Sequence, residues 1–320
     1  MIARPDIDSL LRGPLGAWLN EQALVREEAR ALAVSRWWKA AMIGGPVLLF
    51  LWILAPGWVQ FNIFASMAVA AGGYAWGQAP RAKAIKTVKI GINQAIARAL
   101  DLNYSAEVEP GEVFALACRY ELVPPYDKSR FEDLWHGQVA GRGFGLHEAH
   151  LQERRGSGKN RRYVTVFRGA VMNIDFSREF HGTTLVERAD RHKALFGLGN
   201  HKDSIKFEGH RLDYVDLVNP DFEDVFCVFS DDQVEARYLV HPEYVERLIK
   251  VQQAFAGKDI RALFTSGELV IVVETENMFE SGAINAAEDR TRIERTVDQF
   301  ASLADLAESL NEPERGAVTG

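Results

Sequence analysis

The chain has 320 residues, 47% of them hydrophobic and 25% charged, which is enough apolar material for a sizeable core. Its formal net charge of −7 argues against a generally basic, nucleic-acid-binding protein. Its two cysteines, Cys118 and Cys227, are too widely spaced to form a metal-binding pattern, and in a cytoplasmic domain we expect both to be reduced core residues.

Residues 1–39 are predicted to form a tail and a helix. Met1–Gly16 contains two prolines and two glycines, which indicates a loose tail. Ala17–Lys39 is rich in Ala, Glu, Leu and Arg, and these residues favour a helix. We expect that helix to continue directly into the apolar segment that follows.

Residues 40–80 contain no charged residue. A membrane-spanning helix needs about 20 apolar residues, so this segment is long enough for two slightly short crossings. Pro56 and Gly57 favour a turn near its middle. The sequence therefore predicts a transmembrane hairpin with helices over Ala40–Ala55 and Phe61–Gly77. The alternative is a buried helical hairpin in a soluble core, and an uncharged run of this length fits lipid better.

The residues that flank the predicted hairpin indicate its orientation. Aromatic side chains lie where lipid–water interfaces are expected, at Trp37, Trp38, Trp58, Phe61, Tyr74 and Trp76. Cations lie on both sides of the hairpin and not in its turn, at Arg26, Arg30, Arg36, Lys39, Arg81, Lys83, Lys86 and Lys89. Because positive charge stays on the cytoplasmic side, we expect a multi-pass protein with both termini in the cytoplasm.

Residues 81–126 are predicted to be a juxtamembrane helical segment. Apolar residues recur at helical spacing through Arg81–Leu100, which indicates an amphipathic helix. Lys83, Lys86 and Lys89 could contact anionic headgroups, or could serve only to set orientation. A short extended stretch over Leu102–Val108 and a short helix over Val113–Leu122 complete the segment.

Residues 127–280 are predicted to form a strand-rich cytoplasmic domain, and residues 281–320 a C-terminal helix and tail. Short strands with turn signals between them favour an antiparallel sheet or a partial barrel. The turn signals include Arg168 and Gly169, Asn219–Asp221, and Ser266 and Gly267, around which a hairpin is expected. The predicted strands are Phe131–Val139, Phe144–Glu153, Tyr163–Phe167, Val171–Phe176, Thr183–Arg188, a strand near Ile205, Arg211–Val218, Val225–Phe229, Glu235–Val240, Ile260–Phe264 and Leu269–Val273. A helix is expected from Pro242. The fold class is therefore α+β, a two-helix transmembrane hairpin followed by an antiparallel-sheet domain with flanking helices.

Two short motifs resemble parts of known ligand-binding patterns. Gly141, Gly143 and Gly145 lack the third spaced glycine of a dinucleotide-binding loop, so a turn or bulge is the better interpretation. His147 and His150 are three residues apart, whereas the zinc protease pattern places its histidines four apart on one helical face. We therefore expect no metal and no cofactor at either motif.

Two charged clusters are weak candidates for a site. Asp231, Asp232 and Glu235 could hold a cation such as Mg²⁺ or Ca²⁺, although a solvated turn or a pair with Arg237 is favoured. The strongest basic cluster could bind anionic lipid headgroups or could be a solvated hairpin tip. It consists of Arg154, Arg155, Lys159, Arg161 and Arg162. No aromatic platform for stacking bases surrounds it, which argues against nucleic acid.

Several segments resemble an uncharacterised bacterial membrane family, classified as a domain of unknown function. The resemblance is carried by Asn219–Phe226, Ser230–Leu239, Phe167–Gly169 and Asn277–Glu280, and it covers most of the chain after Arg81. It implies a two-helix membrane anchor, a cytoplasmic domain, an envelope-associated role beside LemA-type proteins, and a protein partner. The family has no established activity, so the resemblance implies no catalytic residues.

These observations lead to three hypotheses about function. The first is a non-enzymatic interaction or scaffold module at the bacterial inner membrane, with the lipid bilayer and a membrane or envelope protein as its partners. The second is a membrane-surface enzyme that holds a cation at the clustered carboxylates. The third is a domain that senses anionic lipid through its basic cluster. No nucleophile elbow or phosphate-binding loop occurs in the sequence, so whether the protein is an enzyme stays open, leaning toward no.

Overall fold

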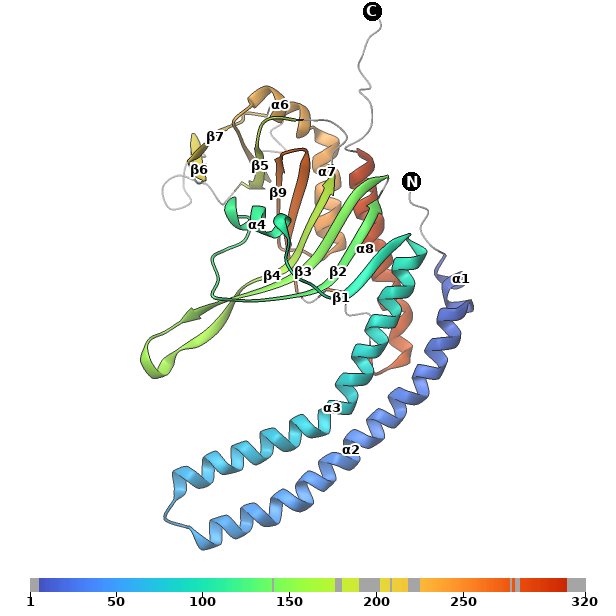
Figure 1. Ribbon diagram of the computed structural model, residues 1–320, viewed down its shortest axis with the longest axis vertical. Coiled ribbons are helices and arrows are strands. Elements are labelled where there is room, and N and C mark those ends of the chain that lie inside the picture. The colour runs from blue at the N-terminus through green and yellow to red at the C-terminus, as the bar shows by residue number, and fades with distance from the viewer. Residues whose placement is uncertain are drawn as a thin grey trace, which may run out of the picture. The chain divides into compact units, whose positions relative to one another are not determined.

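Figure 1 shows a computed structural model of the chain, which describes residues 6–139, 141–175, 180–189, 202–207, 209–217, 225–276, 278–279 and 283–309. The chain divides into two compact units. Unit 1 comprises Met1–Pro5, Ile96–Phe279 and Arg295–Gly320. Unit 2 comprises Asp6–Ala95 and Glu280–Glu294. Each unit is described separately.

Unit 2 begins with a short helix, α1 (Ile7–Arg12), in a segment where the sequence predicts a loose tail. That prediction was wrong, because Asp6 caps the helix by accepting a hydrogen bond from the backbone N–H of Asp8 at 3.1 Å. Helix α2 (Pro14–Leu54) follows, with proline in its first turn, where no backbone donor is needed. As predicted, it passes without a break from the Ala- and Glu-rich segment into the apolar one.

A tight connection joins α2 to helix α3 (Val59–Ala99). Asn62 stabilises this connection because its side-chain amide donates to the carbonyl of Ala55, the C-cap residue of α2, at 2.9 Å. The prediction of a separate helix from Arg81 was wrong, since α3 continues through Pro80. Proline inside a helix is destabilising. The residues that follow Pro80 favour a helix and carry a continuous apolar stripe, and their contribution outweighs the cost of the proline.

Helices α2 and α3 lie side by side within unit 2. The ring of Trp37 stacks on Tyr74 with centroids 6.2 Å apart, and the Arg36 guanidinium donates to the carbonyl of Trp76 at 3.2 Å. Among the described helices, α2 is the one whose length and apolar composition fit a membrane span. Its most apolar stretch is not buried within the protein. The structure therefore supports one candidate membrane helix, and a second crossing by α3 stays a prediction.

Unit 1 is built on a large antiparallel sheet, so the α+β class with an antiparallel sheet is confirmed. Within the described residues it has ten strands in the order β1-β2-β3-β4-β10-β9-β5-β8-β7-β6. The order is open, with β1 and β6 at its two ends. The strands are β1 (Leu102–Glu107), β2 (Lys128–Val139), β3 (Arg142–Arg155), β4 (Arg162–Asp175), β5 (Thr184–Arg188), β6 (Ser204–Phe207), β7 (His210–Tyr214), β8 (Phe226–Ser230), β9 (Asp259–Thr265) and β10 (Glu268–Glu274).

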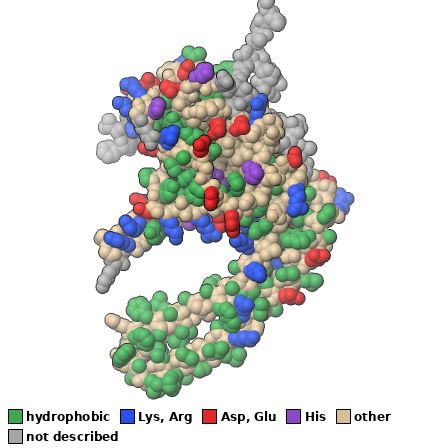
Figure 2. Space-filling model, viewed as in Figure 1, with side chains coloured by type: hydrophobic (Ala, Val, Ile, Leu, Met, Phe, Trp, Pro, Cys, Tyr) green, Lys and Arg blue, Asp and Glu red, His purple; other side chains and the backbone are tan. Residues whose placement is uncertain are grey.

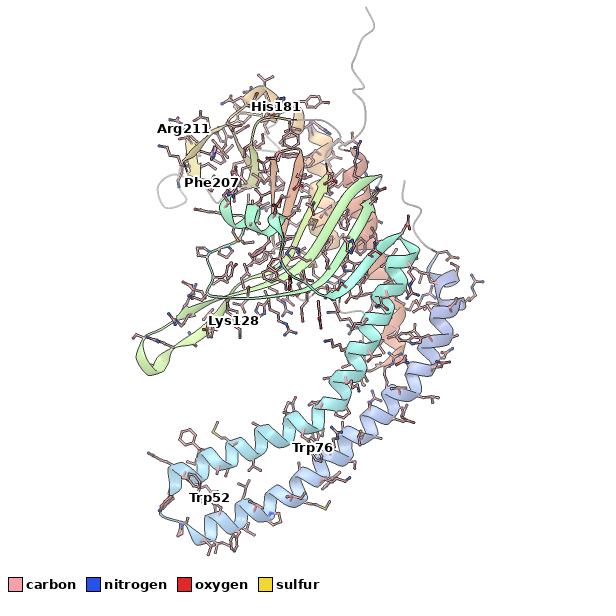
Figure 3. All side chains as sticks on the ribbon, in the orientation of Figure 1. Trp52, Trp76, Lys128, His181, Phe207 and Arg211 are labelled. Carbon is pink, nitrogen blue, oxygen red and sulfur yellow. The ribbon has the colours of Figure 1, made fainter. Side chains whose placement is uncertain are left out.

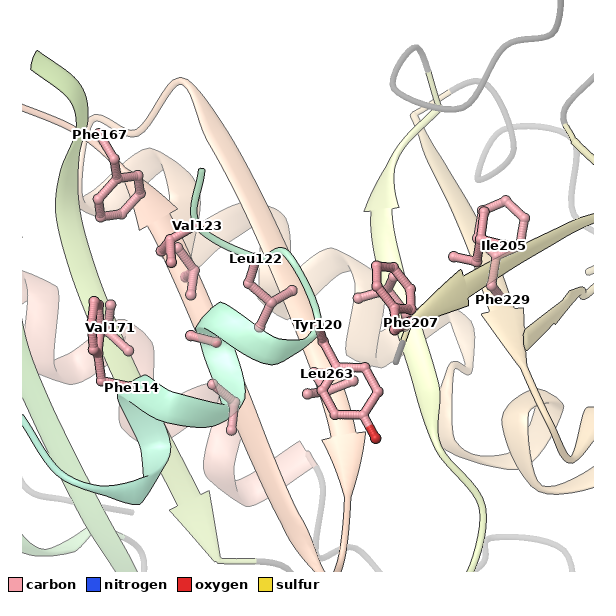
Figure 4. Packing of buried hydrophobic residues seen from close by; sticks show 14 of the residues in the cluster. Phe114, Tyr120, Leu122, Val123, Phe167, Val171, Ile205, Phe207, Phe229 and Leu263 are labelled. Carbon is pink, nitrogen blue, oxygen red and sulfur yellow. The ribbon is translucent and has the colours of Figure 1, made fainter. Parts of the chain in front are cut away.

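Helices cover both faces of the sheet (Figure 1). Helix α4 (Glu112–Arg119) packs on one face, where Phe114, Leu122 and Val171 join a buried apolar cluster (Figure 4). Cys227 is buried in the same cluster, while Cys118 packs at its margin and is half-buried. Helix α7 (Pro242–Ala254) covers the other face, together with the part of α8 (Asp289–Ser309) that starts at Arg295.

Two aromatic contacts show that α7 and α8 pack against the sheet. The ring of Tyr244 in α7 lies 5.3 Å from that of Phe264 in β9, and Phe300 in α8 lies 4.6 Å from Trp135 in β2. Strands β9 and β10 form the predicted hairpin around Ser266 and Gly267. Both turn residues have positive φ, as a two-residue hairpin turn requires.

Two predictions about unit 1 were wrong. Glu235–Val240, predicted as a strand, lies almost entirely in helix α6 (Gln233–Leu239), because Asp232 caps that helix through the N–H groups of Val234 and Glu235. The turn predicted at Arg168 and Gly169 is instead the middle of the single strand β4. The predicted turn at Asn219–Asp221 lies outside the described residues.

Candidate functional site

Strands β3 and β4 extend beyond the rest of the sheet as a two-stranded arm. Strand β2 pairs with β3 only as far as Gln152, and β10 pairs with β4 only as far as Gly169. Beyond Gln152 and Thr165 the two strands pair with each other alone, which defines the β-arm as residues 153–164. Figure 1 shows this ribbon projecting from the sheet.

The tip of the β-arm is a turn over residues 156–161 that contains two glycines and the 3-10 helix Gly158–Asn160. Gly156 and Gly158 have φ values of +90° and +56°, in the left-handed region that glycine adopts readily. A side chain at Gly156 would also collide with the carbonyl of Asn160. The turn therefore fixes the two strands of the arm in register up to Arg155 and Arg162.

The β-arm carries the basic cluster that the sequence singles out. Arg154, Arg155, Arg161 and Arg162 are all exposed, and Figure 2 shows Lys and Arg side chains gathered there; the side chain of Lys159 lies outside the described part of the chain. Residues 153–164 include one acid, Glu153, which accepts a hydrogen bond from Arg155 at 2.8 Å. Five cations therefore face a single carboxylate within the arm.

More cations lie where the β-arm leaves the sheet. Lys128 in β2 is at this base (Figure 3), and its ammonium lies 5.7 Å from the centroid of the Tyr163 ring, which is 52% exposed. His150 in β3 contacts the Thr165 hydroxyl at 2.8 Å. Burial lowers the pKa of His150, and the positive charges of Arg168 and Arg130 lower it further. The surface at the base of the arm therefore carries the cation of Lys128, whereas the lowered pKa of His150 favours its neutral form. Arg130 and Arg168 are paired there with Glu132 and Glu148.

A buried carboxylate lies beneath this surface. Glu148 in β3 is 2% exposed, accepts from Arg168 at 3.1 Å, and accepts from the backbone N–H of Met278 at 3.1 Å. Burial raises its pKa to about 7, against the lowering effect of these two donors. A neighbouring cleft of about 370 Å³ is lined by Thr165, Val166, Phe167, Arg168, Lys258, Glu274, Thr275 and Glu276.

The histidine motif does not form a metal site in this fold. His147 and His150 lie on a strand, so their odd spacing directs them to opposite faces of the sheet. His147 packs against the rings of Phe114 and Phe131, and burial lowers its pKa to about 4. Among the residues that the structure describes, no group of three or more His, Cys, Asp or Glu side chains is arranged to hold a metal.

The three clustered carboxylates accept hydrogen bonds from backbone N–H groups. Asp231 accepts from the N–H of Thr183 at 2.6 Å, Asp232 caps α6, and Glu235 accepts from the N–H of Gly182 at 2.7 Å. Arg237 does not form the expected pair with these acids; its guanidinium donates to the carbonyl oxygens of Asp216 and Gln233. Through these hydrogen bonds the acids hold the loop before β5 against the start of α6, so their role in this fold is structural.

The remaining predicted site residues also have local explanations. Gly141 has φ of +76° in the connection between β2 and β3, and a strand follows it where a dinucleotide-binding loop needs a helix. In unit 2, the side chains of Lys83 and Lys86 are exposed on α3, and Lys89 is half-buried.

Two ion pairs with a buried carboxylate are not predicted by the sequence. Glu148 and Arg168 are far apart in the chain and meet only through strand pairing. In unit 2, Arg26 pairs with Asp289 at 2.7 Å and is 2% exposed, although its sequence position suggests a topogenic surface charge. The orientation prediction must therefore omit Arg26.

One family model matches part of the chain. Residues 165–312 match the model of DUF3137, a protein of unknown function. The predicted resemblance to a domain of unknown function is therefore confirmed for these residues. The DUF3137 match begins in β4, just beyond the β-arm, and includes most of the sheet and α7; the membrane anchor and the neighbouring LemA-type proteins stay predictions.

Other comparisons add little to the DUF3137 match. No curated protein matches the sequence. A crystal structure of the mycobacterial trehalose monomycolate transport factor A, TtfA, is similar at a TM-score of 0.35 and 10% identity, over 70% of this chain and 96% of that chain. A likeness at this level does not establish a common fold.

Proposed function

We propose that this protein is a non-enzymatic interaction module held at the bacterial inner membrane. In this proposal α2 and α3 both cross the bilayer, and the sheet domain and both ends of the chain are cytoplasmic. The observation that carries the proposal is the uncharged segment of residues 40–80, whose large apolar side chains face outward. Lipid is the surrounding that such a surface requires.

The exposure of these side chains supports a lipid-facing anchor. On α2, Ile43, Phe50 and Ile53 are 68%, 64% and 66% exposed, and on α3 Phe64 is 71% exposed. Figure 2 shows hydrophobic side chains covering the ends of α2 and α3 next to their connection. Leaving this much apolar surface in water would cost about 25 cal/mol for each Å².

The hydrogen bonds at the connection between α2 and α3 also suit a membrane environment. In unit 2, Asn62 donates to Ala55, Ser66 donates to the carbonyl of Asn62 at 2.7 Å, and Trp52 donates to the Ser66 hydroxyl at 3.3 Å. Polar groups near lipid must find partners within the protein. The network gives partners to the Asn62 amide N–H, the Ser66 hydroxyl and the Trp52 indole, while the Asn62 side-chain oxygen has none among the described residues. The three satisfied donors support the proposal that the pair crosses the bilayer as a unit.

The sheet domain supports interaction more than catalysis. Its β-arm presents exposed cations to solvent, while the acids that could have held a catalytic cation accept backbone hydrogen bonds. We propose a membrane or envelope protein as the partner of this domain, alongside the bilayer itself. The second hypothesis, a cation-dependent enzyme, receives no support from the geometry of Asp231, Asp232 and Glu235.

Reporter fusions test the orientation. A reporter that is active only in the cytoplasm is fused after the C-terminus and, separately, inserted between Pro56 and Gly57. We expect activity for the C-terminal fusion and none for the insertion. Activity at both sites would mean that α2 and α3 do not cross the membrane.

Partner capture tests the interaction role separately. Cross-linking the full chain in intact cells, before detergent extraction, should yield a stoichiometric adduct with a membrane or envelope protein. The absence of any such adduct in the presence of a correctly oriented anchor would contradict an interaction module.

A further inference from the structure

We infer that the β-arm is a docking element for the anionic headgroups of the phospholipid bilayer. This inference deepens the proposed function and rests on it, because a membrane-held domain meets lipid phosphates at high effective concentration. It concerns residues 153–164 and the adjoining Lys128, all within unit 1. The ligand that we infer for the arm is the phosphate-bearing surface of the bilayer.

The geometry of the arm suits a broad surface better than a pocket. The arm is a narrow two-stranded ribbon with exposed side chains on both strands and on its turn. Its glycine turn holds Arg155 and Arg162 directly opposite each other, and Arg154 opposite Tyr163. Because the strands are paired, less backbone freedom is lost on binding than for a disordered basic tail.

The chemistry of the arm matches phosphate. Four of its five cations are arginines, whose planar guanidinium groups bind phosphate oxygens through two parallel hydrogen bonds. Tyr163 is half-exposed among them, and a half-buried aromatic ring is typical of the lipid–water interface. This local excess of positive charge stands out in a chain whose net charge is −7.

The composition of the arm favours lipid over the other polyanions. Single-stranded nucleic acid binds to rows of aromatic side chains, and Tyr163 is the one aromatic residue in the arm. An acidic protein needs a complementary surface with apolar contacts at its centre, whereas the side chains described in the arm are almost all charged or polar. Headgroups need only accessible cations, each worth about 1 kcal/mol near an anionic surface.

Vesicle binding by the full chain tests this inference. The protein is held in a neutral amphipathic polymer without lipid and mixed with vesicles of phosphatidylcholine alone, or with about a third phosphatidylglycerol. We expect flotation with the anionic vesicles at low salt, release at high salt, and little flotation with neutral vesicles. The fourfold variant R154Q/R155Q/R161Q/R162Q should lower the apparent affinity by about tenfold or more.

A matched variant separates the arm from general charge. The variant K202Q/K206Q/R211Q/K250Q removes the same number of exposed cations from other parts of unit 1, including Arg211 in β7, away from the arm (Figure 3). It should bind anionic vesicles like the wild type. Equal losses in both variants, or none in the arm variant, would overturn the inference, and so would arm-dependent binding of polyglutamate or RNA without vesicle binding.

The two proposals fail in different ways. A chain that is monodisperse in plain buffer would contradict the membrane anchor whatever the vesicles show. A chain that needs the polymer but ignores anionic vesicles would contradict only the role of the arm. Circular dichroism of both fourfold variants should match the wild type, because every substituted side chain is exposed.

Discussion

At the residue scale, the buried charges of this protein determine how it responds to substitution and pH. Arg26, Asp289, Glu148 and His147 are all buried. A buried charge is tolerated only with good partners, and a buried titratable group shifts its pKa toward the neutral form. Both consequences can be measured.

Removing Arg26 should destabilise unit 2. Its guanidinium donates to both carboxylate oxygens of Asp289, at 2.9 and 2.7 Å, and to the carbonyl of Ala283 at 3.0 Å. Arg26→Ala would leave Asp289 buried without its partner, so the free energy of unfolding should fall by about 3 kcal/mol. Chemical denaturation in detergent measures this loss.

A neighbouring arginine provides the control for that substitution. Arg30→Ala removes an exposed charge from the same helix and should change the stability by less than about 0.5 kcal/mol. The double variant with Met at 26 and Leu at 289 should recover much of the lost stability, because no charge is then buried. Equal effects of Arg26→Ala and Arg30→Ala would contradict the buried pair.

Glu148 should make stability fall as pH rises. Its pKa is about 7 in the folded protein and about 4.5 when unfolded, so the folded state binds more protons between these values. The stabilising contribution is complete below about pH 4.5 and is lost as pH rises through 7. Glu148→Gln keeps an acceptor for Arg168 and removes this contribution.

Denaturation at several pH values checks this prediction. The stability of the wild type relative to Glu148→Gln should decrease between about pH 4.5 and 7, by at most about 1.4 kcal/mol per pH unit. His147 has a lowered pKa, so its stabilising contribution is lost as pH falls through 4 and acts in the opposite direction, but it is the same in both proteins. A constant difference across this range would show that Glu148 does not titrate there.

At the element scale, β4 shows how one residue misleads a sequence-based prediction. The sequence predicts a turn at Gly169, yet this residue lies inside a strand beside Glu274 of β10. A side chain there would collide with the carbonyl oxygen of Val273, so glycine permits the close approach of the two strands. Elements with a clear local pattern were predictable: β10 is a run of apolar, mostly β-branched residues, and α7 has apolar residues at helical spacing.

Gly169→Ala should weaken the centre of the sheet. The added Cβ meets the backbone of β10, which cannot rotate away, so the free energy of unfolding should fall by about 1–3 kcal/mol. Thermal unfolding followed by far-ultraviolet circular dichroism measures the change. Gly111→Ala, where the added Cβ meets open space, is the control. Gly111 is the N-cap of α4, where Ala is less favourable than Gly, so a small loss of stability is expected there, below that of Gly169→Ala.

At the scale of the whole molecule, the sequence reveals the charged and apolar segments but not the order of the strands in the sheet. A charge-free segment of sufficient length indicates an anchor from sequence alone, and the basic cluster is visible as a run of arginines. The position of β5 between β9 and β8 is not visible, because alternation identifies a strand without its neighbours. For the same reason, the ion pairs of Glu148 and Arg26 and the projection of the β-arm required the structure.

The central claim is that lipid surrounds residues 40–80, and solubility without detergent tests it most directly. Membranes from cells expressing the full chain are washed with alkaline carbonate, and the protein is then followed by size-exclusion chromatography with and without detergent. We expect it to stay in the washed membranes and to run as one species only in detergent. A chain released by the wash and monodisperse in plain buffer would contradict the account.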